Sequence, residues 1–120
     1  MAREYFTLTD QNDVHRSTRS NLDGSQVYAG AGDDKVWGTD GFDLVWGGQG
    51  NDSIFGYAGD DLLRGLEGND FMMGGDGNDR IYGHIGNDNL WGQNGNDSID
   101  CSAGDDRGYG NNGHDYINGG

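Results

Sequence analysis

Apolar residues recur at a fixed interval of nine along most of the chain. Aligned at that period, residues 29–118 form ten successive units, and the eighth position of a unit is apolar in nine of them. These residues are Val36, Val45, Ile54, Leu63, Met72, Ile81, Leu90, Ile99 and Ile117, and the exception is Gly108. The neighbours of the eighth position vary, as Ser53 and Phe55 do around Ile54. One residue that faces inward between two that face outward is typical of a very short β-strand.

Glycine and aspartate occupy fixed positions in the rest of each unit. The fourth position is Gly and the sixth is Asp in all ten units, and the first is Gly in eight. Gly allows the positive φ that a tight turn needs, and Asn or Asp at the fifth position tolerates the same region. Each unit is therefore predicted to be a turn followed by a short strand. Two units make one coil of eighteen residues, so residues 29–118 would form about five stacked coils, an all-β fold with two short parallel sheets.

The composition of the chain is unusual for a globular protein. Hydrophobic residues make up 32% of the 120 residues, and the formal net charge is −14. This combination is also typical of disordered chains, but a strict repeat argues for an ordered structure. Strong acidity disfavours nucleic acid and anionic membrane surfaces as partners, and no apolar run is long enough for membrane insertion.

The acidic residues are almost all of one type, with 19 Asp and 2 Glu. A preference for the short carboxylate indicates a geometric role, in turns or around a cation. In stacked coils the sixth-position Asp side chains would lie above one another and repel. Carboxylates and turn carbonyls are oxygen ligands, which suit Ca²⁺ and offer nothing for zinc or copper, and His15, His84 and His114 share no metal-ligand spacing. The pattern therefore predicts a hard-cation ligand set at every turn.

The units, such as GGQGNDSIF at residues 47–55, closely resemble the repeats-in-toxin (RTX) nonapeptide family, GGxGxDxUx. The resemblance covers residues 29–118 and implies a right-handed parallel β-roll with Ca²⁺ between successive coils. The sixth-position carboxylates it implies as ligands are Asp34, Asp43, Asp52, Asp61, Asp70, Asp79, Asp88, Asp97, Asp106 and Asp115. The fourth-position carbonyls it implies are those of Gly32, Gly41, Gly50, Gly59, Gly68, Gly77, Gly86, Gly95, Gly104 and Gly113.

The resemblance also implies what the chain does. If each ion bridges a unit and the next but one, ten units hold about eight Ca²⁺ ions. The expected function is a module that folds on binding calcium in the extracellular space, within a bacterial protein exported by type I secretion. No enzymatic activity is expected, because no nucleophile motif is present and GYGNNG at residues 108–113 matches a dinucleotide fingerprint only through the repeat glycines.

Residues 1–28 follow the repeat only loosely and are expected to be an N-terminal cap or linker before the β-roll of residues 29–120. The segment NLDGSQVY (21–28) looks like a degenerate starting unit, with Val27 in the inward position and Ser25 where Asp belongs. The segment YFTLT (5–9) alternates like a strand and is a candidate cap for the first coil. The alternative is a disordered linker from a preceding domain.

The ninth position of each unit should point outward, so on one sheet Trp37, Phe55, Met73, Trp91 and Tyr109 would form a column. An exposed apolar column usually marks a contact surface. It could pack against residues 1–28, a neighbouring domain or a second copy in a homodimer. It could also bind glycans, which gives the alternative function: a carbohydrate- or surface-binding accessory module of an extracellular enzyme or adhesin.

The ninth unit, CSAGDDRGY, departs most from the pattern. Cys101 replaces the first-position Gly, and Gly108 stands where an apolar side chain is expected. Both residues would face inward within the same coil, so the hypothesis is that the Cys101 side chain partly fills the space that Gly108 leaves.

Overall fold

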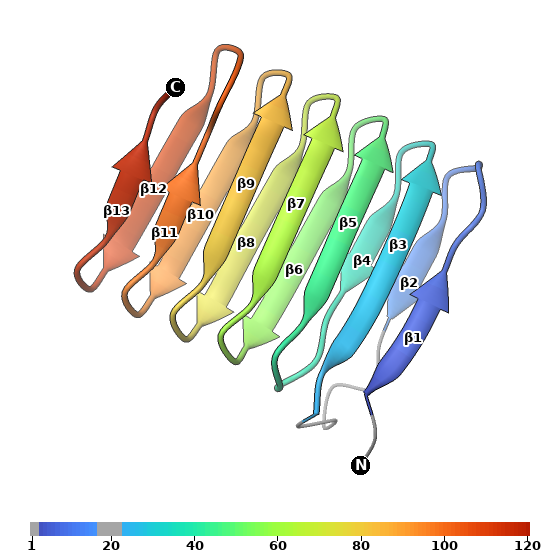
Figure 1. The fold of residues 1–120 in the computed structure, drawn as a ribbon, viewed down its shortest axis with the longest axis horizontal. Helices are drawn as coiled ribbons and strands as arrows, with labels where there is room; N and C mark the ends of the chain where they lie inside the picture. Colours follow the sequence, from blue (N-terminus) through green and yellow to red (C-terminus); the bar gives the residue numbers. More distant parts are fainter. Residues whose placement is uncertain (1–2, 17–22) are drawn as a thin grey trace.

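The structure is a computed structural model that describes residues 3–16 and 23–120, and these residues contain strands and turns but no helix. The strands form two parallel sheets that face each other, and the chain passes from one to the other at every turn (Figure 1). One sheet contains β1 (Glu4–Thr7), β3 (Ser25–Ala31), β5 (Leu44–Gln49), β7 (Leu62–Glu67), β9 (Arg80–Ile85), β11 (Ser98–Asp100) and β13 (Tyr116–Asn118). The other contains β2 (Val14–Arg16), β4 (Lys35–Trp37), β6 (Ser53–Ala58), β8 (Phe71–Asp76), β10 (Asn89–Asn94) and β12 (Arg107–Asn112).

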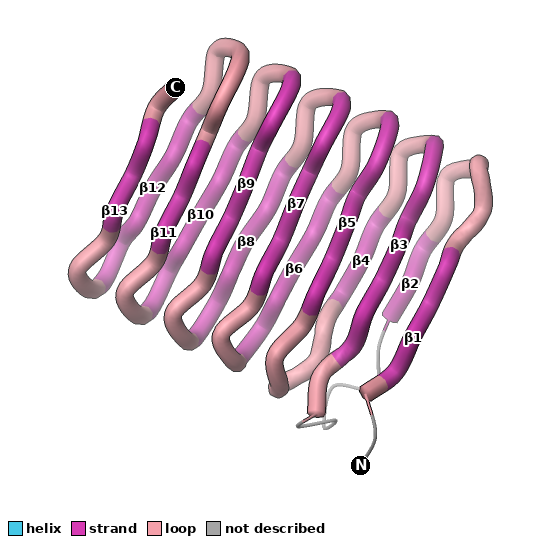
Figure 2. Tube along the Cα trace, viewed as in Figure 1, coloured by secondary structure: helices cyan, strands magenta, loops and turns pink. Residues whose placement is uncertain are grey.

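The register of the sheets repeats every eighteen residues from β3 onward. Ile54 pairs with Met72 in one sheet, and Leu63 pairs with Ile81 in the other. Short strands alternate with tight turns along the whole stack (Figure 2). The prediction of an all-β parallel β-roll is confirmed, and the roll has about six turns.

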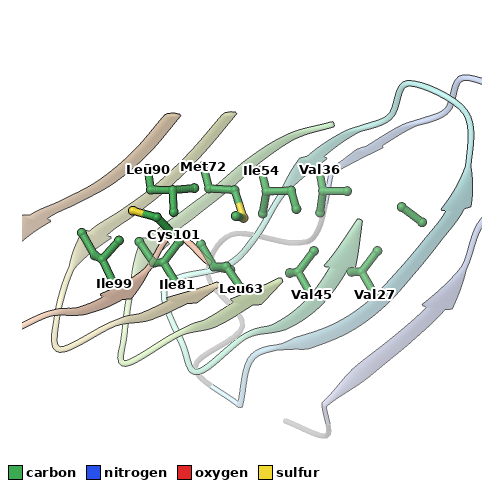
Figure 3. Packing of buried hydrophobic residues seen from close by; sticks show 11 residues of the cluster. Val27, Val36, Val45, Ile54, Leu63, Met72, Ile81, Leu90, Ile99 and Cys101 are labelled. Atoms are coloured by element: carbon green, nitrogen blue, oxygen red, sulfur yellow. The ribbon is translucent and has the colours of Figure 1, made fainter. Parts of the chain in front are cut away.

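The core is one layer of side chains between the two sheets. The eighth-position residues from Val36 to Ile99 are at most 1% exposed. Val27, from the N-terminal segment, is equally buried and belongs to the same layer. Figure 3 shows them in two facing rows, with Val36, Ile54, Met72 and Leu90 opposite Val27, Val45, Leu63, Ile81 and Ile99. Fully burying one such side chain contributes roughly 1.5–3 kcal/mol. Because the sheets share only this layer, the extent of the roll along its shortest axis is only 13 Å.

The N-terminal segment adds a further coil to the five expected from residues 29–118. The strand expected within residues 5–9 is present at Glu4–Thr7 and pairs with β3, and β2 pairs with β4. The register offset here is 21 residues, as in Glu4 with Ser25, and not 18. Residues 17–22, which include the start of the predicted degenerate unit, lie outside the described part of the chain.

His15 occupies the inward position of this first coil. Its side chain is 8% exposed, and its ring lies 4.0 Å from that of Phe6 between centroids. Burial lowers the pKa of His15, and the nearby charge of Glu4 opposes the shift. The nine-residue alignment missed this residue because the 21-residue offset breaks the period between β2 and β4.

Cys101 fills the space beside Gly108, as hypothesised from the sequence. The thiol is buried within the core cluster, and its Sγ lies 3.1 Å from the position that a Cβ on Gly108 would take. Burial raises the pKa of the thiol, and the carboxylates of Asp106, Asp100 and Asp88 raise it further. Cys101 is therefore a packing residue.

Cys101→Gly is expected to lower the melting temperature of the calcium-loaded protein, because it leaves a cavity that costs about 1–2 kcal/mol. Gly108→Ala in the same chain should restore part of the loss, since the new methyl group would occupy the vacated space. Thermal unfolding of the two single variants and the double variant gives the coupling between them. An unchanged melting temperature in Cys101→Gly would contradict the packing role.

The outward columns consist of side chains stacked on their neighbours. Trp37 and Phe55 are stacked at 5.6 Å with 13° between the ring planes, and Trp91 and Tyr109 at 4.2 Å and 24°. The Arg16 guanidinium lies 4.4 Å over the Trp37 ring. Contacts within the column thus cover ring faces, as is usual for in-register aromatic residues of neighbouring strands.

Candidate calcium sites in the turns

The turns line the two long edges of the roll, and each edge carries one column of sixth-position aspartates. The turns that follow odd-numbered strands form the Asp34 edge, which contains Asp34, Asp52, Asp70, Asp88 and Asp106 and lies at the top in Figure 1. The turns that follow even-numbered strands form the Asp43 edge, which contains Asp43, Asp61, Asp79, Asp97 and Asp115. Along either edge, neighbouring aspartates come from successive coils.

These carboxylates are buried although each lies in a turn. From Asp34 to Asp97 they are at most 2% exposed, while Asp106 and Asp115, in the last coil, are partly exposed. Position-one glycines make room for them: a Cβ on Gly65 would overlap Oδ2 of Asp70, and the same holds for the other first-position glycines and the Asp of their own unit. The preference for Gly at the first position follows from this contact.

One oxygen of each carboxylate accepts a hydrogen bond from the neighbouring coil. The backbone N–H of Asp52 donates to Oδ1 of Asp70 at 2.8 Å, and the N–H of Asp70 donates to Oδ1 of Asp88 at the same distance. The Asp43 edge repeats the arrangement, as from Asp61 to Oδ1 of Asp79. The column of aspartates therefore connects successive turns through a continuous ladder of hydrogen bonds.

The second oxygen of most of these carboxylates has no partner. Buried Oδ2 atoms without a hydrogen bond in the described part of the chain belong to Asp34, Asp52, Asp61, Asp70, Asp79, Asp88, Asp97 and Asp106. A buried carboxylate oxygen that nothing satisfies is costly, and several within one column also repel each other. The arrangement requires protons or cations along both edges.

Burial accordingly raises the pKa of the central carboxyls. The pKa rises from 3.8 to about 7 for Asp52, Asp70 and Asp79, and to about 9 for Asp61. Burial is the largest cause, and neighbouring aspartates of the column add to it. The backbone N–H that each Oδ1 accepts acts in the opposite direction. At neutral pH these groups favour a bound positive charge. A cation would offset the same cost of burial and mutual repulsion that a bound proton offsets.

The fourth-position carbonyls supply further oxygen atoms. A Cβ on Gly68 would overlap the carbonyl oxygen of Gly50, and a Cβ on Gly77 that of Gly59, so these carbonyls also form columns. The carbonyl oxygens of Gly50, Gly59, Gly68, Gly77, Gly86 and Gly95 accept no hydrogen bond from the described residues. In that part of the chain, no group of three or more His, Cys, Asp or Glu side chains is placed so that side chains alone could hold a metal ion. A cation here would therefore take backbone carbonyls as well as carboxylates, a donor set that fits the six to eight oxygen ligands of Ca²⁺.

The fifth position has a role that the sequence did not reveal. The fifth residues are not in the left-handed region, so tolerance of positive φ does not explain the preference for Asn and Asp. Instead, Oδ1 of Asn51 accepts the backbone N–H of Asn69, and Oδ1 of Asn69 accepts that of Asn87, both at 2.8 Å. The fifth- and sixth-position ladders run in opposite directions, and together they satisfy the backbone N–H groups of these two positions in most turns.

The turn at residues 38–43 differs from those of the other nine repeat units. Both oxygens of Asp43 accept hydrogen bonds, from Thr39 and from Ser25, and Gly41 lacks the positive φ of the other fourth-position glycines. Of the predicted ligand set, Asp43 and Gly41 are therefore in an environment of their own.

Comparison with known families agrees with this geometry. A profile of the RTX calcium-binding nonapeptide repeat matches the chain in four copies, at residues 28–63, 37–72, 64–99 and 100–120. The chain therefore belongs to the family of RTX calcium-binding repeats and is a calcium-binding parallel β-roll. Neither the curated proteins nor the solved structures contain a match to it. In the described residues, no helix has the length and apolarity needed to cross a membrane.

The raised carboxyl pKa values predict how the calcium-free roll responds to pH. The folded state holds these protons more tightly than the unfolded chain, whose carboxyls titrate near 3.8. Their contribution to stability is therefore fully present below about pH 4 and is lost as the pH rises through about 7, and for Asp61 through about 9. Thermal unfolding in metal-depleted buffer between pH 4 and 9 should show stability falling with pH. Stability that rises over this window would contradict the assignment.

Proposed function

We propose that this module folds when Ca²⁺ binds between successive coils, and that it does so outside the cell. The observation that carries the proposal is the pair of columns of buried Oδ2 atoms that no described group satisfies. Divalent cations at these oxygens would remove both the desolvation cost and the repulsion within each column. Since the ligand set exists only in the coiled chain, binding free energy becomes folding free energy.

The proposed ligands are the sixth-position carboxylates and the free fourth-position carbonyls of the turns. Each ion would join a turn to the next turn on the same edge, as the Oδ1 ladder already does. Four such intervals exist on each edge between Asp34 and Asp106 and between Asp43 and Asp115. Ca²⁺ supplies charge neutralisation and a flexible oxygen coordination, while the glycines of the first and fourth positions keep side-chain atoms out of the space around the oxygens.

The proposed calcium requirement and the family support an extracellular setting. Extracellular calcium modules have dissociation constants of about 0.1–1 mM, so a chain of this kind stays unfolded at the low calcium concentrations inside a cell. We infer export in the unfolded state, by the type I route that the family resemblance implies, followed by folding in external calcium.

The alternative of a carbohydrate-binding module has less support. Sugars bind to aromatic side chains by stacking on their open faces. In the outward column the rings of Trp37 and Phe55, and those of Trp91 and Tyr109, already stack on each other. The geometry favours an internal stabilising role for this column.

A calcium titration of the chain followed by far-UV circular dichroism tests the proposal. In excess chelator at neutral pH the spectrum should be that of a largely unfolded chain, and it should change cooperatively to β structure below about 10 mM Ca²⁺. Mg²⁺ serves as the control, because it demands a rigid octahedral site and dehydrates reluctantly. Full β structure in chelator, or an equal response to Mg²⁺, would overturn the proposal.

A further inference from the structure

The Asp43 carboxylate is satisfied by hydrogen bonds that no other described sixth-position residue of units 29–118 receives. The backbone N–H of Thr39 donates to Oδ2 at 2.7 Å, and the Thr39 hydroxyl lies 3.0 Å from Oδ1 and 3.2 Å from Oδ2. The N–H and the hydroxyl of Ser25 donate to Oδ1 at 2.6 and 2.8 Å. Thr39, Ser25 and Asp43 are all fully buried. At eight of the other turns the buried Oδ2 atom has no hydrogen-bond donor, whereas here both oxygens of the carboxylate are surrounded by donors.

The backbone of this turn takes a different path from that of its neighbours. At the second position, Gly48, Tyr57, Leu66 and Gln93 all have positive φ, between 81° and 108°. Thr39 does not, and neither does Gly41 two residues later. A β-branched residue strongly resists the left-handed region. Thr39 instead accepts the N–H of Gly41 on its hydroxyl at 3.0 Å, which fixes a turn of another shape.

A second turn of the chain is built in the same way. Thr9 donates from its N–H and its hydroxyl to Oδ2 of Asp13, at 2.6 and 2.7 Å, and accepts the N–H of Gln11 at 3.2 Å. Both turns share the sequence Thr-Asp-x-x-Asp. The turn of Thr9 precedes Asp34 on the Asp34 edge, and that of Thr39 precedes Asp61 on the Asp43 edge. Each column of carboxylates without an Oδ2 partner therefore starts next to a turn of this type.

We propose that Thr39 takes the place of a calcium ion, so that the interval between Asp43 and Asp61 is not a calcium site and seven of the eight intervals bind Ca²⁺. This inference rests on the proposed function and refines it. The threonine satisfies both Asp43 oxygens with neutral donors, and a cation would have to displace them and change the turn. Thr9 acts in the same way on Asp13. The N-terminal end of the roll is thus closed by hydroxyl groups, and the calcium-dependent part begins after these turns.

Native mass spectrometry of the full chain at saturating Ca²⁺ tests the proposal by counting bound ions. Thr39→Gly changes residues 38–43 from GTDGFD to GGDGFD, which restores the repeat pattern. The wild type should bind seven ions and Thr39→Gly eight. The matched control is Gln93→Gly, which also places Gly at a second position. Gln93 has the positive φ of an ordinary turn, so this change should leave the count at seven.

Two results would overturn the proposal: eight ions on the wild type, or no additional ion on Thr39→Gly when Gln93→Gly is also unchanged. The wild-type count decides the question even if Thr39→Gly does not fold. A wild type that binds no calcium would instead refute the proposed function, so the two failures are distinguishable.

Discussion

Gly68→Ala should prevent the β-roll from forming even in saturating calcium. Gly68 has a φ of +123°, which an alanine rarely adopts, and a Cβ there would overlap the backbone carbonyl oxygen of Gly50 in the preceding coil. The neighbouring atom belongs to the backbone of a turn in the preceding coil and cannot move aside as a flexible side chain would. We expect a loss above about 4 kcal/mol, which is large compared with the stability of most domains.

The control for this prediction is Gly119→Ala, because a Cβ on Gly119 would meet no atom within 4 Å. Circular dichroism and thermal unfolding in calcium should show an unfolded Gly68→Ala chain and a native-like Gly119→Ala chain. A folded Gly68→Ala protein with an unchanged melting temperature would show that the carbonyl column is not packed as described.

Asp70→Asn should change stability in opposite directions with and without calcium. In calcium the variant loses a carboxylate ligand, and we expect the calcium concentration at half-folding to rise by about tenfold or more. In chelator at neutral pH the variant should be more stable than the wild type, because a buried carboxylate with a raised pKa is replaced by a neutral group. The amide oxygen can still accept the N–H that Asp52 donates.

Asp76→Asn is the matched control, since Asp76 is the last residue of β8, just before the next turn on the opposite edge, and its side chain is exposed. It should leave the calcium midpoint nearly unchanged. Calcium-dependent unfolding of the wild type and both variants provides the measurement. A calcium midpoint of Asp70→Asn that matches the midpoint of Asp76→Asn would contradict the ligand role of the Asp70 carboxylate.

The core and the sheets follow from the sequence because one physical rule repeats without interruption. An inward residue every nine positions, such as Ile54 and Leu63, fixes both the strand register and the coil length. Stacking then places every sixth-position Asp beside its counterpart of the next coil. The two columns of carboxylates could therefore be predicted before any coordinates.

Features that interrupt the period could not be predicted in this way. The 21-residue offset at the N-terminus concealed the inward position of His15. The fifth-position ladder is invisible in sequence because an Asn that accepts a hydrogen bond from the next coil looks the same as an Asn that tolerates a turn. The second position varies from unit to unit, so the sequence does not set Thr39 apart, and only its contacts with Asp43 reveal that this turn has its own donors.

The most direct test of the account is anomalous diffraction from crystals of the chain grown in calcium. In calcium, cations should lie against the Oδ2 atoms that lack partners, between successive turns on both edges. Anomalous peaks are expected in two rows, one beside the carboxylates from Asp34 to Asp106 and one beside those from Asp61 to Asp115. A well-ordered β-roll in calcium without peaks at these carboxylates would contradict this placement.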